Sequence, residues 1–172
     1  MSKLTQKFDI TAKYLHWISA FVILWASISG LYIAFFELEM HIKSEILSFN
    51  VSITTVFIPL FCWRIYHRIK QGTPQAHPAM STLEVKLAHV GHTLLYVLVS
   101  LVLVSGVLMM DHDVTVFQLF TIPQLLQQQS SIQFFETVHL YTCRLLAALV
   151  VCHLAALIKH EMMGRRILKR MI

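Results

Sequence analysis

Charged side chains are scarce in this chain of 172 residues: 13% are Asp, Glu, Lys or Arg, whereas 56% are hydrophobic. A soluble globular domain carries about twice that share of charge, so the composition excludes an ordinary soluble domain. None of the apolar stretches shows the polar stripe, repeated every 3.6 residues, that an amphipathic helix of a soluble bundle carries. Four apolar runs are each near the ~20 residues needed to cross a bilayer: 14–36, 47–65, 87–110 and 135–158.

Several motifs of soluble redox enzymes are also absent. The three cysteines, Cys62, Cys143 and Cys152, form neither a C-x-x-C pair nor a C-x-x-C-H haem attachment motif, so they are interpreted as packing residues and any haem is held noncovalently. No Gly-rich phosphate loop or dinucleotide fingerprint occurs, which excludes a nicotinamide or flavin cofactor bound by these signals. Glu136 is the only acid near a helix core, which argues against a histidine-lined metal transporter.

We therefore predict an all-α integral membrane four-helix bundle, formed by a single domain over 1–172. The expected helices are 12–36, 46–69, 83–110 and 134–162. Asp9 or Thr11 caps the first, Ser81 or Thr82 opens the third, and Pro59 should kink the second. The loop 111–134 is expected to be an ordered flap with a short helical piece around 116–119.

Basic residues are distributed unevenly over the connections. By the positive-inside rule, both termini and the 66–86 loop are predicted to be cytoplasmic, since Lys43 is the only basic residue in the other connections. The net charge of +5 thus reflects membrane topology, with the basic tail near anionic lipid headgroups, and gives no reason to expect nucleic acid. The cytoplasmic basic residues are Lys3, Lys7, Lys13, Arg64, Arg68, Lys70, Lys86, Lys159, Arg165, Arg166, Lys169 and Arg170.

Histidines inside the apolar runs are the strongest functional signal, because a membrane-buried imidazole is costly without a partner. His139 and His153 lie fourteen residues apart on one helix face, separated by roughly 21 Å along the axis. His16 lies near the cytoplasmic edge of the first helix, at the depth of His153. A bundle builds cofactor sites from such facing side chains, so His16 and His153 are predicted to ligate the iron of a haem.

A second haem at His139 would need a partner from the matching depth of the second helix, around 48–53. That segment has no histidine, and the amide of Asn50 is a poor ligand for iron. Three readings stay open: another ligand, five-coordinate iron, or no second haem. Residues that could reach inward are His41, His112, Met109 and Met110.

Four further polar residues are candidates for binding a cofactor or a quinone. His92, three residues after His89 at the cytoplasmic start of the third helix, suits a haem propionate or a quinone headgroup, and His160 and Lys70 are quinone-side candidates. Arg144, inside the fourth helix, must face an anion or a wet cavity; its expected partners are a propionate, Glu136 or an anionic substrate. The alternative is that these histidines bind nothing and are solvated or lie at the membrane interface.

Taken together, these residues resemble the bacterial cytochrome b561 family over nearly the whole chain. The matching elements are His16-Trp17, Arg64 with Arg68, Ala88-His89-Val90-Gly91-His92, Leu95-Tyr96, Ser105-Gly106, Met109-Met110, Phe120-Thr121-Ile122-Pro123, His139, His153, Ala155-Ala156, Lys159-His160 and Ile167-Leu168-Lys169-Arg170-Met171.

The resemblance implies a bacterial inner-membrane protein with two haems b, His16 and His153 on the cytoplasmic one and His139 on the other. The remaining family ligand corresponds to Asn50. Members exchange electrons with ubiquinone, and some oxidise superoxide at the periplasmic face. We therefore predict a membrane b-type cytochrome that passes single electrons between an extracytoplasmic donor, superoxide being one, and the quinone pool. The alternatives are a haem-bearing anchor for a soluble redox subunit of a larger oxidoreductase, and a binding or sensor protein without redox turnover.

Overall fold

The computed structural model describes residues 8–72, 74 and 78–172. In this part of the chain four long helices make up most of the structure, and each is long and apolar enough to cross a membrane. The predicted all-α membrane bundle is confirmed. The helices are α1 (Ile10–Phe35), α2 (Met40–Gln71), α3 (Thr82–Leu108) and α4 (Gln129–Met162).

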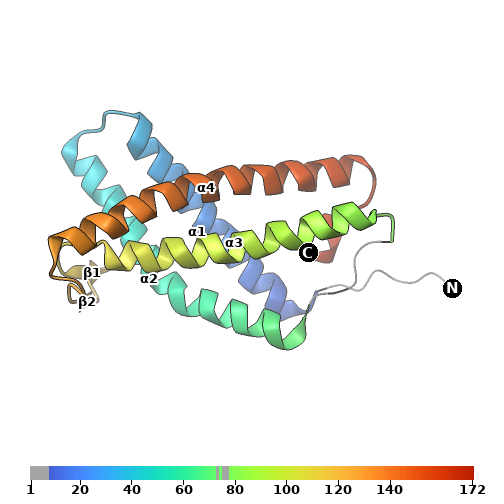
Figure 1. The fold of residues 1–172 in the computed structure, drawn as a ribbon, viewed down its shortest axis with the longest axis horizontal. Coiled ribbons are helices and arrows are strands. Elements are labelled where there is room, and N and C mark those ends of the chain that lie inside the picture. The colour runs from blue at the N-terminus through green and yellow to red at the C-terminus, as the bar shows by residue number, and fades with distance from the viewer. Residues whose placement is uncertain (1–7, 73, 75–77) are drawn as a thin grey trace.

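The helices are arranged as two antiparallel pairs (Figure 1). α1 packs along α2 and α3 along α4, and the pairs meet mainly where α2 contacts α3. One end of the bundle, which we call the hairpin end, holds the α1–α2 connection and two short strands. The other, the termini end, holds the start of α1, the end of α4, the C-terminus and the α2–α3 connection. Pro59 lies inside α2, where it removes one helical hydrogen bond, and Figure 1 shows α2 bending along its length.

The helix starts follow local capping chemistry. The carboxylate of Asp9 accepts a hydrogen bond from the backbone N–H of Ala12 (2.9 Å) and so caps α1. Ser81 and Glu84 form a reciprocal capping box at the start of α3. Asp9 and Ser81, each one of two residues considered from the sequence, are therefore the caps.

Two helices are longer at the hairpin end than hydropathy predicts. α2 begins at Met40 instead of 46, and α4 begins at Gln129 instead of 134. The first turns of α2 contain His41, Lys43 and Glu45, which the hydropathy pattern assigns to a loop. A helix satisfies its backbone hydrogen bonds internally, so it can continue from lipid into water without a change of structure.

A β-hairpin replaces the helical piece expected around 116–119, and that prediction was wrong. Strands β1 (Val114–Val116) and β2 (Phe120–Ile122) pair antiparallel, with Val114 opposite Ile122. Phe117 and Gln118 have φ of 46° and 60°, the backbone of a tight turn between twisted strands. The backbone N–H of Phe117 donates to Ser52 Oγ on α2 (3.1 Å), and Val116 is fully buried. The hairpin is therefore docked onto α2.

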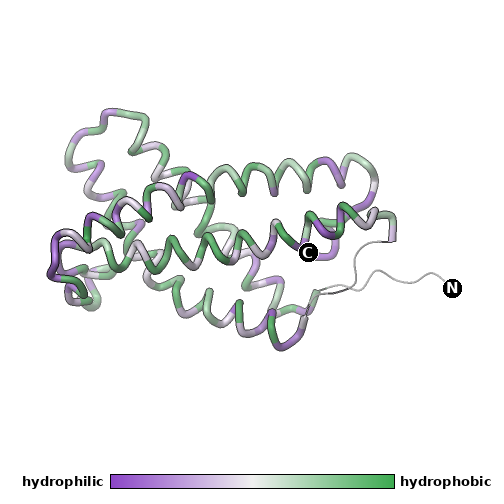
Figure 2. Tube along the Cα trace, viewed as in Figure 1, coloured by the Kyte–Doolittle hydropathy of each residue, from purple (hydrophilic) through white to green (hydrophobic). Residues whose placement is uncertain are grey.

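Few side chains are buried between the helices, and the remaining apolar surface faces outward. Figure 2 shows hydrophobic residues along the bodies of the helices and hydrophilic residues gathered towards both ends, the pattern of a bundle surrounded by lipid. The central buried cluster consists of Val22, Phe57, Phe61, Val99, Leu103 and Leu146.

The C-terminal segment folds back across the termini end. After α4 comes the short helix η1 (Ile167–Arg170), which lies near the start of α1. The backbone carbonyl of Arg170 accepts a hydrogen bond from the N–H of Phe8, two residues before α1 (3.3 Å). The indole N–H of Trp17 donates to the carbonyl of Met171 (2.9 Å). Residues from the two ends of the chain thus close the bundle next to His16, the neighbour of Trp17.

A polar network ties the start of α3 to the end of α4. The guanidinium of Arg165 contacts both Glu84 Oε1 (2.8 Å) and His160 Nδ1 (2.9 Å). We expect Glu84→Ala to lower the melting temperature of the detergent-purified protein by about 2–4 °C, because it removes this ion pair and the capping box. Glu37→Ala, in the exposed α1–α2 connection, is the control. Equal melting curves for the two variants would contradict the assignment of a stabilising role to this network.

Candidate functional site

Three histidines from three helices gather in the half of the bundle near the termini end: His16 of α1, His92 of α3 and His153 of α4. The rings of His92 and His153 lie edge to face, with centroids 5.4 Å apart. His16 is close enough to both to interact with them electrostatically. We call these residues the histidine cluster; it contains His16 and His153, the pair that the sequence analysis predicts to ligate haem iron.

The ring nitrogens of the cluster differ in what they contact. Nδ1 of His92 lies 2.7 Å from the carbonyl of Ala88, and because a carbonyl only accepts, this nitrogen is the donor. Nδ1 of His16 lies 3.1 Å from Nη2 of Arg64, and because a guanidinium only donates, this nitrogen accepts. His153 makes no hydrogen bond within the described residues. Nε2 of His16 and both nitrogens of His153 are therefore available to a ligand.

Two arginines of α2 and one tyrosine of α3 border the cluster. Arg64 donates through Nε to the hydroxyl of Tyr96 (3.1 Å), and the guanidinium carbons of Arg64 and Arg68 lie 5.2 and 5.0 Å from the centre of the Tyr96 ring. Neither arginine has an ion pair with a carboxylate among the described residues. Two partly buried cations without an acidic partner among the described residues are a suitable environment for an anionic group.

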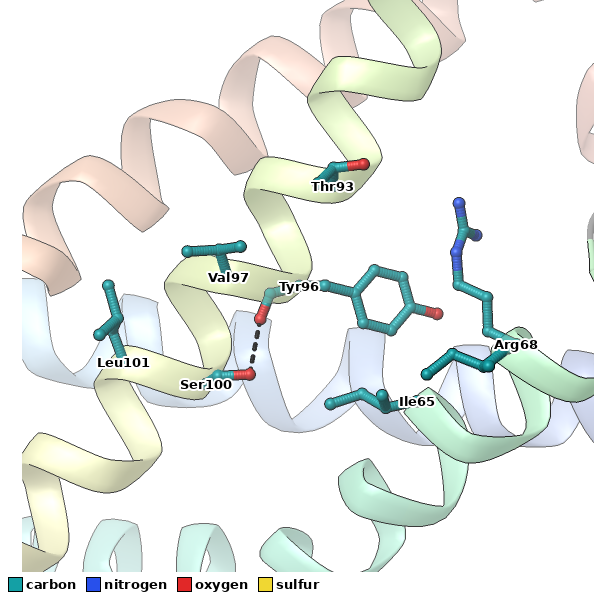
Figure 3. A pocket seen from close by; sticks show the side chains of 8 residues that line it. Ile65, Arg68, Thr93, Tyr96, Val97, Ser100 and Leu101 are labelled. Carbon is teal, nitrogen blue, oxygen red and sulfur yellow. Dashed lines mark hydrogen bonds between the residues drawn. The ribbon is translucent and has the colours of Figure 1, made fainter.

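A groove of about 390 Å³ opens between α2 and α3, and Arg68 and Tyr96 are among the residues that line it. Figure 3 shows Arg68 extending towards the ring of Tyr96, with Ser100 bonded to the Tyr96 carbonyl below it. Arg68, Thr93 and Tyr96 supply polar atoms, and the remaining lining is largely apolar. Tyr96 connects this groove to the cluster, because Arg64 contacts both Tyr96 and His16. The apolar lining consists of Ile65, Ile69, Val97 and Leu101.

His139 stands apart from the cluster, towards the hairpin end of α4. Its Nδ1 donates to the carbonyl of Val102 (3.1 Å) and lies 3.2 Å from Ser105 Oγ, and its Nε2 lies 3.4 Å from Cys143 Sγ. A Cβ on Gly106 would lie 3.2 Å from His139 Cε1, so the absence of a side chain at 106 lets the imidazole lie against α3.

Asn50 is bonded to α1 through its whole amide group. Its Oδ1 accepts from the indole N–H of Trp25 (2.9 Å) and lies 3.0 Å from Ser29 Oγ, and its Nδ2 lies 2.8 Å from the same hydroxyl. Ser29 also donates to the Trp25 carbonyl. The sequence identified position 50 as the place where an iron ligand is missing, and in the structure it forms a polar link between α1 and α2.

The other predicted residues lie outside the cluster. Arg144 is exposed on α4 with its guanidinium 5.8 Å from the centre of the Tyr141 ring, and it has no ion pair within the described residues. Lys70 extends over Tyr66 of its own helix, and His160 contacts Arg165. The structure brings His92 to the cluster but does not bring Lys70, His160 or Arg144 to it.

A comparison with known protein families gives a match over nearly the whole chain. The family model for prokaryotic cytochrome b561 matches residues 7–172. The chain belongs to the prokaryotic cytochrome b561 family. It is therefore a multi-pass bacterial membrane protein of the b-type cytochromes, which bind haem b and transfer electrons. A search of curated proteins finds no match.

The histidine cluster fits a b-type haem. The macrocycle supplies four ligands to iron itself, so it needs only two imidazoles from facing helices. His16 and His153 have nitrogens free for this role, and Arg64 offers a charge complementary to a propionate. Among the described residues, no group of three or more His, Cys, Asp and Glu side chains is arranged to hold a bare metal ion.

Residues at the hairpin end do not fit a second cytochrome b561 haem in the same way. His139 provides one imidazole, whereas Asn50 provides an amide whose oxygen and nitrogen are both hydrogen-bonded to α1. An amide bonded to α1 through both of its polar atoms is not a counterpart of the imidazole of His139, because an amide oxygen is a weak ligand for iron.

Sequence reasoning assigned no site role to Arg64, Arg68 and Tyr96, which here surround the histidine cluster. The signal was present: Arg64 stands at the end of an apolar run with no acid in the same run, and an intramembrane cation needs a partner. The partner could not be predicted, because Tyr96 is thirty-two residues away and reaches Arg64 only through the packing of α3 on α2.

Proposed function

We propose that His16 and His153 are the axial ligands of a haem b held in the histidine cluster, with Arg64 beside a propionate and His92 packed against the ligand His153. The cluster itself carries this proposal: imidazoles from α1 and α4 lie in one neighbourhood with nitrogens free, next to the guanidinium of Arg64, which has no carboxylate partner among the described residues. Bound haem supplies a one-electron Fe(III)/Fe(II) couple.

A change of tautomer at His16 follows from this role. Nδ1 now accepts from Arg64, so the proton of the neutral ring is on Nε2. A ligating Nε2 must be deprotonated, which places the proton on Nδ1 and turns that nitrogen into a donor. Arg64 then loses its acceptor on His16 and becomes available to a carboxylate.

We propose that the termini end is cytoplasmic. The basic connections predicted to be cytoplasmic converge there, since the start of α1, the α2–α3 connection and the end of α4 share this end. The proposed haem would then lie in the cytoplasmic half of the membrane, and His139 in the extracytoplasmic half.

The proposed activity is transfer of single electrons between a donor and the quinone pool. The groove between α2 and α3 is a suitable approach for a quinone, because its apolar walls suit the ring and Arg68, Thr93 and Tyr96 offer polar atoms to its carbonyls. His160, His92 and Lys70 are the other quinone-side candidates. An extracytoplasmic donor, superoxide being one, is the proposed second partner, which would make the chain an oxidoreductase.

Reduction of the purified protein by a short-tailed ubiquinol, followed at the haem α-band, tests this proposal. We expect Arg68→Gln to slow reduction about tenfold, equivalent to one charged hydrogen bond of about 1.5 kcal/mol, with an unchanged haem content. Lys70→Gln and His160→Gln are the matched comparisons. If only the Lys70 and His160 variants are reduced slowly, the quinone binds at the helix ends instead. If ubiquinol does not reduce the wild-type haem, the proposal that quinone is a partner is wrong.

A haem-bearing anchor subunit is the second candidate, and the hydrogen bonding of Asn50 favours it. If electrons cannot be relayed through the extracytoplasmic half, the donor must be a soluble redox subunit at the cytoplasmic end. Co-purification with an iron–sulfur or flavin subunit would support this version. A chain that binds haem but exchanges electrons with neither quinol nor a subunit would instead be a binding or sensor protein.

A further inference from the structure

Asn50 and His139 occupy equivalent depths in the bundle. Each lies ten residues after the first residue of its helix, Met40 of α2 and Gln129 of α4, and both helices start at the hairpin end. Ten residues of helix rise about 15 Å. A haem ligated by His139 would therefore have position 50 of α2 as the natural source of its opposite ligand.

The side chain at position 50 is committed to another structural role. Asn50 Oδ1 accepts a hydrogen bond from the indole N–H of Trp25, and Asn50 Nδ2 donates to Ser29 Oγ, so both polar atoms of the side chain have partners on α1. Amide oxygens are hard, weakly donating ligands, and haem proteins use imidazole, thiolate, thioether or phenolate instead. Releasing Asn50 towards iron would also leave the Trp25 N–H without its acceptor.

Three partly exposed aromatic side chains lie beside this link. The ring of Phe49 lies edge to face with both Trp25 (centroids 5.3 Å) and Phe117 (5.8 Å), so one aromatic series runs from α1 over α2 to the turn of the β-hairpin. The Ser52 hydroxyl, one turn along from Phe49, accepts from the Phe117 N–H. These contacts link α1, α2 and the β-hairpin.

Two of the four alternative ligands considered from the sequence, His41 and His112, are engaged elsewhere. His41 is exposed and lies 3.3 Å from Glu39. His112 is exposed and bonded to its neighbour Asp111, which lowers the pKa of that carboxyl below its usual value. Both rings are paired at the surface of the hairpin end, and neither lies against His139 in the described structure.

From these contacts we propose that this chain is a one-haem member of its family, in which the Asn50–Trp25–Ser29 link closes the extracytoplasmic half in place of a second haem. The inference rests on the proposed haem between His16 and His153. His139 then has a packing role against Val102 and Gly106. With no second haem to relay electrons across the ~21 Å between the levels of His139 and His153, the haem exchanges electrons with partners on its own side of the membrane. On this inference the donor is therefore cytoplasmic and not the extracytoplasmic donor proposed above.

Haem per polypeptide, measured on the detergent-purified protein by the reduced pyridine spectrum and amino-acid analysis, tests this inference. We expect one haem in the wild type and in His139→Ala, with the same reduced α-band in both. His153→Ala is the matched control on the same helix and should lose the haem. Redox titration adds a second readout, which should fit a single one-electron component in the wild type and in His139→Ala.

Each result separates the inference from the function on which it rests. Two haems in the wild type, or a second titrating component that disappears in His139→Ala, would overturn the one-haem inference and leave the His16–His153 site standing. One haem that is lost in His139→Ala but kept in His153→Ala would overturn both. Asn50→His is expected to remain at one haem, because the contacts among Trp25, Phe49 and Phe117 beside position 50 do not depend on the Asn50 amide. A gain to two haems would overturn the inference that this link stands in place of the second haem.

Discussion

His153→Ala is expected to abolish the low-spin b-type spectrum of the reduced protein, with haem per polypeptide falling close to zero. The imidazole of His153 has no hydrogen bond in the described structure, so its removal breaks no polar contact of the protein itself. What it removes is one of two strong-field ligands, without which a noncovalently held haem keeps only hydrophobic and propionate contacts. Difference spectra of purified protein, normalised to polypeptide, measure the loss.

His92→Ala is the matched control for this variant. The ring centroids of His92 and His153 are 5.4 Å apart, so both substitutions open a cavity of similar size in the same cluster. His92 is bonded to the backbone of its own helix through Nδ1. We expect His92→Ala to keep its haem and a low-spin spectrum. The reverse pattern, with haem kept in His153→Ala and lost in His92→Ala, would show that His92 is the ligand from this side.

Arg64→Gln is expected to lower the midpoint potential of the haem by about 60 mV, which is about 1.4 kcal/mol for one electron. A cation beside the cofactor favours the reduced iron, because reduction adds a negative charge to the site. Removing the Arg64 charge therefore makes the oxidised state relatively more stable. The effect is large because Arg64 is part-buried and has no carboxylate partner among the described residues to offset its charge. Potentiometric titration of the α-band measures the shift.

Arg64→Lys serves as the control, since it keeps the charge but loses the fork of donors that contacts both His16 and Tyr96. Its potential should stay within about 20 mV of the wild type on the same electrostatic argument. An equal fall in both variants would mean that hydrogen-bond geometry, and not charge, sets the potential. An unchanged potential in Arg64→Gln would place the haem away from this arginine.

Helix number, helix caps and the ligand-bearing helices could be predicted from the sequence. Long apolar runs are a local property of the chain, and so are the Asp9 cap and the Ser81–Glu84 capping box, which use groups three residues apart. The helix starts at Met40 and Gln129 were missed because hydropathy records where lipid ends and not where hydrogen bonding ends. The β-hairpin was missed because the turn at Phe117 and Gln118 depends on docking to Ser52, which is far away in the sequence.

The sequence by itself determined that this chain is a membrane bundle of the cytochrome b561 family, with imidazoles at two depths of α4 and no histidine at position 50. The membrane bundle and the spacing of the histidines follow from residue type and helical period, whereas the family followed from the resemblance of the motifs. Only the tertiary structure decided which cations and rings surround His16 and His153, and that Asn50 is bonded to Trp25 and Ser29. Those pairings join residues at least twenty-one positions apart, so they exist only once packing has set the rotation of each helix about its axis.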